Sequence, residues 1–241
     1  MWYTSICKVI GDDVMEKPIS SEEIYQDILN RIIDLELEPG SKISENRISD
    51  EYGVSRSVIR NAFARLTQDM FLTVYPQRGT YVNYIDLDYI RTALLIRISI
   101  EKEMLYRFMK KKDKSNIIEK MKLNIKKQEN FYYANEYMEE FQGLDEEFHE
   151  YIIVSVENKN ILNLISVHLL HISRWRNVYI RLGYKVSHLI DEHRLILKYI
   201  EEDDLDMALQ CMTNHIETVT GEIHIDPEYK HYFMSSESGK R

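Results

Sequence analysis

Apolar side chains recur every three or four residues along most of the chain, the spacing of one face of a helix. Isoleucines at positions 24, 28 and 32 follow the capping-box pattern Ser20-Ser21-Glu22-Glu23, and Pro39-Gly40 ends the run. This predicts a first helix from about residue 21 to residue 35. A second, shorter helix is expected over residues 45–52 and a third over residues 55–68.

Two β-rich runs, 71–75 and 80–82, flank the turn Pro76-Gln77-Arg78-Gly79 and predict a hairpin. Helix, helix, turn, helix and hairpin is the order of a winged helix-turn-helix, which we expect over residues 20–84. Residues 1–19 show no period and are expected to form an N-terminal arm.

The pattern is helical from residue 86 to about residue 221. The segment 94–100 is rich in β-branched residues and could pass as a strand, but the surrounding apolar period favours a helix. The predicted fold class is mainly α: the winged helix-turn-helix is followed by an all-α antiparallel helical bundle over residues 85–221. Residues 222–241 are expected to form a polar C-terminal tail. The expected helices cover residues 86–112, 115–132, 137–156, 159–182, 186–202 and 204–221.

The composition is that of an ordinary globular protein, with 241 residues, of which 44% are hydrophobic and 29% charged. No apolar run reaches the roughly 18 residues of a membrane span, and the N-terminus lacks a signal-peptide pattern. Cys7 and Cys211 lie far apart and fit a reducing compartment better than a disulfide framework. We therefore expect a cytoplasmic protein with no membrane partner.

The formal net charge of −9 counts against a protein that coats nucleic acid non-specifically. Residues 55–68 depart from this acidity, because they contain no acidic side chain and present Arg56, Ser57, Arg60 and Asn61 on one outer face. Guanidinium forks, hydroxyls and amides fit phosphates and the guanine O6 and N7 atoms in a major groove. The competing interpretation is a solvated helix face with incidental arginines.

Two further features support a DNA-reading surface. Ser55 stands at the start of the third helix, where the helix N-terminus can meet a phosphate. Arg78-Gly79 at the hairpin tip would allow close approach to the minor groove or the sugar–phosphate chain. Because residues 20–84 are slightly acidic as a whole, specific affinity is expected to need a dimer.

A carboxylate and three imidazoles occupy apolar helical faces in the second half of the chain. Asp145 and His149 are four residues apart on one side of the expected helix 137–156, and His193 and His215 repeat the anomaly on two later helices. Such groups are costly in a core unless something pairs them, so the four residues form a candidate metal site.

Other interpretations of the histidines stay open. Each could be a core residue that hydrogen bonds satisfy. His168 and His171 are i, i+3 neighbours and could supply a ligand instead. His188, His224 and His231 are expected at the surface or in the tail.

Four stretches of this chain carry a family resemblance: Leu37-Glu38-Pro39-Gly40, Ile43-Ser44-Glu45, Tyr52-Gly53-Val54-Ser55-Arg56-Ser57-Val58-Ile59-Arg60-Asn61-Ala62 and Arg78-Gly79-Thr80-Tyr81-Val82. The first three resemble the DNA-binding domain of GntR-family bacterial transcription regulators, and the fourth resembles the wing of that domain. The resemblance implies that Arg56 and Arg60 contact bases, with Ser55, Ser57 and Gly79 nearby. Asn46 stands where the family usually has an arginine, so Arg47, one place later, is the candidate substitute.

The second half is similar to the FCD domain of the FadR-type branch of that family, through Asp145 and His149 (Asp-x-x-Phe-His), Glu192-His193 and His215-Ile216. The resemblance implies a divalent metal inside the bundle, with a small carboxylate effector beside or on it. Three imidazoles and a carboxylate suit Zn²⁺, Ni²⁺, Mn²⁺ or Fe²⁺ and leave room for a ligand oxygen. The candidate effector-binding arginines are Arg97, Arg174 and Arg176.

These expectations combine into a homodimeric, sequence-specific transcription regulator, a repressor that reads a short palindrome and responds to a small organic acid. Two alternatives remain. One is a metal-dependent enzyme of helical-bundle type, for which no separate general base stands at motif spacing. The other is a regulator whose metal is purely structural or is itself the signal.

Overall fold

The computed structural model describes residues 19–156, 160–217 and 227–233, which form two compact units. The N-terminal unit contains the described residues up to Ile32 together with residues 40–83. The helical unit contains residues 33–39 and the described residues from Tyr84 onward. Three expectations lie outside the described residues: almost all of the N-terminal arm, His224, and the end of the last helix near residue 221.

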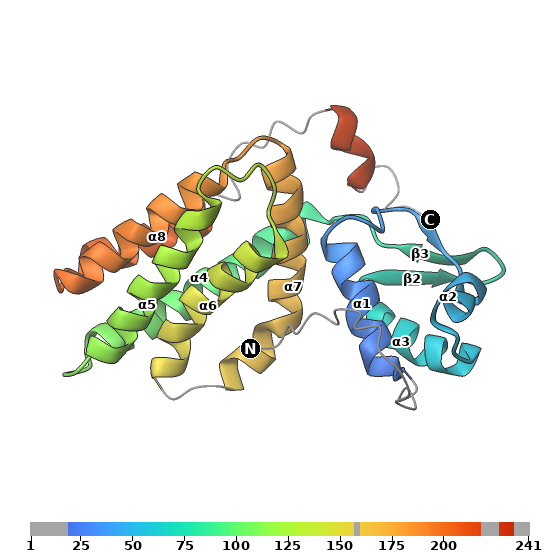
Figure 1. Ribbon diagram of the computed structural model, residues 1–241, viewed down its shortest axis with the longest axis horizontal. Coiled ribbons are helices and arrows are strands. Elements are labelled where there is room, and N and C mark those ends of the chain that lie inside the picture. The colour runs from blue at the N-terminus through green and yellow to red at the C-terminus, as the bar shows by residue number, and fades with distance from the viewer. Residues whose placement is uncertain (1–18, 157–159, 218–226, 234–241) are drawn as a thin grey trace, which may run out of the picture. The chain divides into compact units, whose positions relative to one another are not determined.

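The N-terminal unit combines helices with a three-stranded antiparallel sheet of order β1-β3-β2 (Figure 1). Tyr81 of the central strand pairs with Lys42 on one side and Thr73 on the other. The predicted winged helix-turn-helix is confirmed, and the short extended piece before the second helix is its third strand. The elements are α1 (Ser21–Ile33), β1 (Lys42–Ile43), α2 (Glu45–Tyr52), α3 (Arg56–Gln68), β2 (Leu72–Tyr75) and β3 (Gly79–Val82).

Local chemistry sets the ends of the short helix α2. The Ser44 side chain accepts a hydrogen bond from the backbone N–H of Arg47, as an N-cap residue does. Gly53 ends the helix with a φ of 62°, in the left-handed region that glycine adopts without a Cβ penalty. These two residues fix where the chain turns into α3, and therefore which residues of α3 stay outside.

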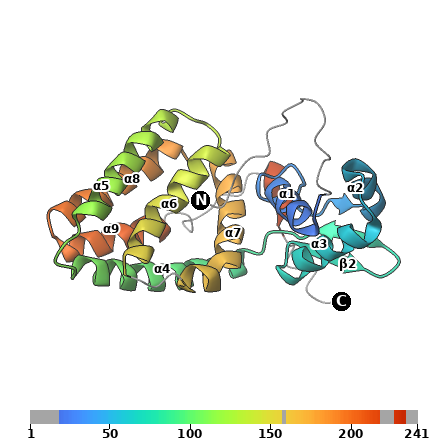
Figure 2. The same ribbon diagram turned by 60° about the horizontal axis from the view of Figure 1, so that its bottom comes forward.

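Helices α4 to α9 form the helical unit (Figures 1 and 2). Helix α4 packs against α6, α7 and α9, α5 packs against α6 and α8, and α8 packs against α9. None of the described helices is long and apolar enough to cross a membrane. The bounds are α4 (Leu87–Met109), α5 (Ser115–Gln128), α6 (Glu139–Ser155), α7 (Asn160–Arg181), α8 (Val186–Glu201) and α9 (Leu205–Glu217).

Several of these helices are shorter than predicted. Asp86 is the N-cap of α4, its carboxylate accepting from the backbone N–H groups of Asp88 and Tyr89, and the helix ends at Met109 rather than residue 112. The β-branched segment 94–100 lies inside α4, so the helical interpretation is confirmed. Helix α5 ends at Gln128 and continues as one 3₁₀ turn, η1 (Glu129–Phe131).

Residues 227–233, which the sequence assigns to a polar tail, pack onto the helical unit. Pro227–Tyr232 form the 3₁₀ helix η3, and Tyr232 is only 3% exposed. The Tyr232 hydroxyl donates to the Glu38 carboxylate at 3.0 Å, and its carbonyl accepts from the Ile85 N–H at 2.9 Å. Tyr232 therefore contacts Glu38, which precedes residues 40–83 of the N-terminal unit in the sequence, and Ile85, which follows them.

Candidate metal centre and nucleic-acid interface

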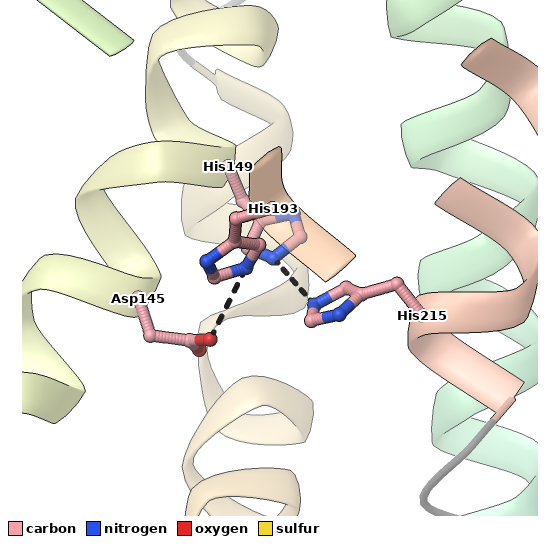
Figure 3. Close-up of side chains that lie close together, drawn as sticks. All are labelled: Asp145, His149, His193 and His215. Atoms are coloured by element: carbon pink, nitrogen blue, oxygen red, sulfur yellow. Dashed lines mark hydrogen bonds and ion pairs between the residues drawn. The ribbon is translucent and has the colours of Figure 1, made fainter. Parts of the chain in front are cut away.

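Three helices bring the four candidate ligands together in the core of the helical unit. Asp145 and His149 lie one turn apart on α6, while His193 comes from α8 and His215 from α9. One ligand atom from each of the four side chains lies within 4.8 Å of all the others, and all four residues are buried (Figure 3). Residues from three helices, 22 to 70 positions apart in the sequence, therefore share one small volume.

Two of the imidazoles face each other through the same ring nitrogen. His149 Nε2 lies 3.1 Å from His215 Nε2 (Figure 3). On the far side of each ring, His149 Nδ1 lies 2.6 Å from a Glu101 oxygen and His215 Nδ1 lies 2.8 Å from a Glu192 oxygen. A carboxylate accepts only, so the hydrogen bond with Glu192 places the proton of a neutral His215 on Nδ1, and the nearby Glu101 favours the same position in His149, which leaves Nε2 of each neutral ring with a lone pair. Two lone pairs at this distance repel, so either a proton or a metal cation must lie between the two nitrogens.

The third imidazole is oriented by an amide. His193 Nδ1 lies 2.8 Å from Gln128 Oε1. The Gln128 Nε2 donates to Asn124 Oδ1 at 2.6 Å, and Asn124 Nδ2 donates to the Leu144 carbonyl at 3.0 Å, so this chain determines which end of the Gln128 amide meets the ring. His193 Nδ1 must therefore donate.

His193 Nε2 points instead toward Asp145, whose Oδ1 lies 3.5 Å away. Neither of these two buried atoms has a hydrogen-bond partner among the described residues. Buried polar atoms almost always have a hydrogen-bond partner, so the close approach of these two unpaired acceptor atoms needs an explanation. A cation bound by Asp145 Oδ1 and the three Nε2 atoms would supply it, and the donor set fits a transition-metal ion.

The protonation states at the centre also suit a metal. Burial lowers the pKa values of His193 and His215 well below the ordinary histidine value, which keeps both rings neutral. Burial opposes the ionisation of Asp145, but the Arg176 guanidinium outweighs it and holds the pKa of that carboxyl well below its usual range. Neutral imidazoles and an ionised carboxylate are the forms that bind a metal.

The three candidate effector arginines are all buried. Arg176 Nη1 donates to Asp145 Oδ2 and, at 3.2 Å, to the Tyr137 hydroxyl, which itself donates to the same carboxylate oxygen at 3.1 Å. Arg97 Nε donates to Glu101 Oε1 at 2.5 Å. Arg174 lies on α7 with Arg176, and burial lowers its pKa to about 9. Arg97 and Arg176 thus adjoin the centre through a carboxylate each.

The other histidines are accounted for elsewhere. His168 Nδ1 is hydrogen-bonded to the Tyr89 hydroxyl at 2.8 Å, and the His171 ring packs edge-on against the Tyr89 ring. Neither belongs to the group of four, so the structure does not support them as substitute ligands. His188 and His231 are exposed, as expected.

Sequence reasoning did not assign the residues that hold the imidazoles. Glu192 enters the sequence pattern only as the neighbour of His193, and the pattern assigns no role to Glu101 or Gln128. Gln128 is fully buried on the same face of α5 as Met121 and Ile125. A polar residue in an apolar stripe is the signal that found the histidines, and it would also have found this glutamine.

The nucleic-acid candidates lie on the outside of the N-terminal unit. The two reading arginines of α3, Arg56 and Arg60, are exposed, and so are Asn46 and Arg47 on α2. Ser55 is the N-cap of α3, but its hydroxyl bonds to that of Ser57 at 2.8 Å and does not cap the helix. The first N–H groups of α3 therefore remain available to an anion.

The wing adds a residue that the sequence did not single out. Gly79 has a φ of 113°, and a Cβ there would lie 2.7 Å from Lys42 Cε. Lys42 reaches the wing because β1 pairs with β3, a contact between segments that are far apart in the sequence. Exposed Arg78 and Lys42 give the wing two positive charges where it would approach DNA.

Comparison with protein families matches residues 20–82 to the family described as bacterial regulatory proteins, gntR family, and residues 93–218 to the FCD domain. An HTH-type transcriptional regulator from an unstable DNA locus of Streptomyces ambofaciens is 26% identical over 201 residues, 83% of this chain and 84% of the relative. The HTH-type transcriptional repressor RspR of Escherichia coli K12 is 24% identical over 200 residues, 83% and 87% of the two chains.

A solved structure, E. coli McbR/YncC, matches with a TM-score of 0.66, covering 82% of this chain and 93% of that one at 14% identity. At that identity the match shows a shared fold only. It covers the larger part of both chains, so the order of a winged N-terminal unit and a helical unit is common to the two proteins.

Proposed function

The chain belongs to the GntR family of bacterial regulatory proteins, with an FCD domain as its helical part, and is a transcriptional regulator of that type; we propose that it is a homodimeric repressor whose operator affinity is set by a small organic acid bound at a divalent metal centre. The observation that carries the proposal is the inward-facing set of three Nε2 atoms and Asp145 Oδ1.

The metal would be held by Asp145, His149, His193 and His215. His193 and His215 each have a hydrogen-bond acceptor behind the ring, and His149 Nδ1 lies 2.6 Å from a Glu101 oxygen; such partners orient a ring and raise its basicity as a ligand. When bound, a Zn²⁺, Ni²⁺, Mn²⁺ or Fe²⁺ ion supplies a Lewis-acidic position for an oxygen ligand. The protein's own part is to keep His193 and His215 neutral and to aim all three rings inward.

Charge supports an anionic effector. Asp145 and Glu101 are each paired with a buried guanidinium, Arg176 and Arg97, so these four formal charges cancel. A divalent cation would add two positive charges to a buried site, and an organic acid would offset them. Arg176 keeps Nε and Nη2 without a hydrogen-bond partner among the described residues, and two such donors suit a carboxylate.

The modest charge of the reading surface supports the proposed dimer. Arg56 and Arg60 give each α3 two guanidinium forks, while Glu45, Asp50 and Glu51 on α2 are acidic. One such surface makes few phosphate contacts, and two of them on a palindrome roughly double the binding free energy.

Helix α7 is hydrogen-bonded to the backbone at the end of α1, in the segment 33–39 that belongs to the helical unit. Arg176 contacts Asp145, and the next residue, Asn177, donates its side-chain amide to the Ile33 carbonyl at 3.0 Å. Arg181 donates to the Asp34 carbonyl at 2.9 Å. Ile33 ends α1, so a shift of α7 on ligand binding would move the backbone that continues into the N-terminal unit.

The main competing role is a purely structural metal, which the near-complete burial of the four ligands favours. Thermal unfolding of the metal-loaded chain with a panel of mono-, di- and hydroxy-carboxylic acids separates the two. The proposal expects at least one acid to raise Tm, and only when metal is present. A structural metal predicts stabilisation by the metal and no response to any acid.

Matched variants sharpen that experiment. His149→Ala should abolish metal binding and the acid response, whereas His188→Ala, which removes an exposed imidazole from α8, should change neither. Arg176→Gln removes the partner of Asp145 and should weaken metal binding, and it should lose the acid response even when enough metal is added to fill the centre. Metal retention by His149→Ala at wild-type affinity would contradict the assignment of the centre.

A further inference from the structure

An ion pair joins the first turn of α2 to the outward face of α3. Arg60 Nε donates to Glu45 Oε2 at 3.0 Å. The Arg60 side chain is 65% exposed and that of Glu45 is 31% exposed, so the guanidinium stands in solvent with a carboxylate behind it. An acidic residue is thus in contact with one of the two arginines expected to read DNA bases.

The contact uses one particular edge of the guanidinium. Arginine has a single N–H on Nε and two on each Nη, and it can present either the Nε–Nη edge or the Nη–Nη end to a pair of acceptors. Glu45 occupies Nε and leaves the Nη1–Nη2 end for other acceptors. That end matches the O6 and N7 atoms of guanine as a bidentate contact.

We propose that Glu45 is a specificity-determining residue of this regulator, which holds Arg60 end-on for guanine and weakens its contacts with backbone phosphates. The proposal rests on the proposed function, because it requires Arg60 to face bases. A free arginine gains from any phosphate it can reach, whatever the sequence. An arginine already paired with a carboxylate gains less, because the carboxylate is repelled by the same phosphate.

Contact with guanine does not carry that penalty. The base edge is neutral, and Nη1 and Nη2 can donate to it while Nε stays on Glu45. The pair also restricts the rotation of a long side chain before DNA arrives, so less freedom is lost on binding. The carboxylate should therefore lower affinity for random DNA more than affinity for the operator.

The simpler role for Glu45 is helix stabilisation, because a carboxylate in the first turn interacts favourably with the helix dipole. The same helix offers a matched control. Glu51 lies at the other end of α2 and pairs with Arg31 of α1, at 2.9 Å between Oε1 and Nη1. Glu51→Gln removes one negative charge and one ion pair from α2 without touching Arg60.

The test is the selection of bound duplexes from a random-sequence pool by the full-length protein, followed by sequencing to obtain the preference at each position. Wild type, Glu45→Ala, Glu45→Gln, Glu51→Gln, Arg60→Ala and Glu45→Ala/Arg60→Ala would be compared, each checked for folding by circular dichroism. Anisotropy titrations on the selected operator and on a scrambled duplex then give the ratio of the two Kd values.

Arg60→Ala is expected to remove a guanine preference at one position of each half-site. Glu45→Ala should weaken the preference at that same position and lower the operator-to-scrambled ratio about tenfold, within the range of one bidentate base contact. The loss should come largely from tighter binding to scrambled DNA, with a steeper salt dependence. Glu51→Gln should leave the preference unchanged, and the double variant should match Arg60→Ala.

Two results would overturn the proposal in distinguishable ways. If Arg60→Ala removes a base preference but Glu45→Ala and Glu45→Gln both keep it, Glu45 is only a helix residue and the function proposed for Arg60 stands. If Arg60→Ala changes no base preference, the reading role of Arg60 fails, and the role of Glu45 fails with it.

Discussion

Replacing Gln128 with leucine tests whether the hydrogen bonds behind the imidazoles determine metal binding. Leucine has a similar size and no polar atom, and the site is fully buried. The change removes the acceptor 2.8 Å from His193 Nδ1 and the donor 2.6 Å from Asn124 Oδ1. The His193 proton can then move to Nε2, and nothing holds the ring in place.

The expected losses of metal affinity and folding stability follow from those two hydrogen bonds. Loss of a hydrogen-bond partner behind a metal-binding histidine typically weakens metal affinity about 10–100-fold. Each buried group left without a partner costs about 1–3 kcal/mol of folding stability in addition. Gln128→Leu should therefore lower both metal affinity and the free energy of unfolding, and the two effects must be separated.

A competition titration against a chromophoric chelator measures the metal affinity, at a temperature where circular dichroism shows the variant folded. Met121→Ala is the control, because it opens a cavity on the same buried face of α5 without touching an imidazole. It should lose stability, about 2–5 kcal/mol, and keep its metal affinity. Gln128→Glu restores an acceptor and should recover most of the affinity. Wild-type affinity in folded Gln128→Leu would refute the reasoning.

Three further outcomes are expected. Arg56→Ala should cost about 1–3 kcal/mol of specific operator binding by anisotropy if that residue reads a base, whereas exposed Arg107→Ala on α4 should cost nothing. Gly79→Ala should lower Tm modestly and weaken operator binding, because a Cβ at a φ of 113° strains the wing and displaces Lys42; unchanged binding would remove the wing from the interface. Free metal at a hundred times its Kd should stabilise wild type by about 2.7 kcal/mol and His193→Ala far less, as measured by chemical denaturation.

The parts of the fold that follow from local pattern were predictable from the sequence. Helical periodicity predicted α1 to α9, and β-rich runs around a turn predicted the hairpin, because each signal lies within one element. The same period exposed Asp145 and His149 as polar residues on an apolar face. The expected helix 137–156 would also place Met138 on that face, but Met138 precedes α6 and is 44% exposed.

Contacts between elements were not predictable in this way. His193 meets Gln128 across 65 positions, and Lys42 meets the wing only because β1 pairs with β3. The ion pair of Glu45 with Arg60 depends on the angle between α2 and α3. None of these contacts produces a periodic pattern in the sequence. The aromatic residues of the tail that pack on the helical unit are also too few to form a pattern.

The most direct test of the central claim is operator binding by the metal-loaded protein, measured by anisotropy with and without the acid that raises Tm. The claim predicts that the acid changes the operator Kd several-fold or more, and that the change disappears after chelation and in His149→Ala. An operator Kd that stays constant whether metal and acid are present or absent would contradict regulation through this centre.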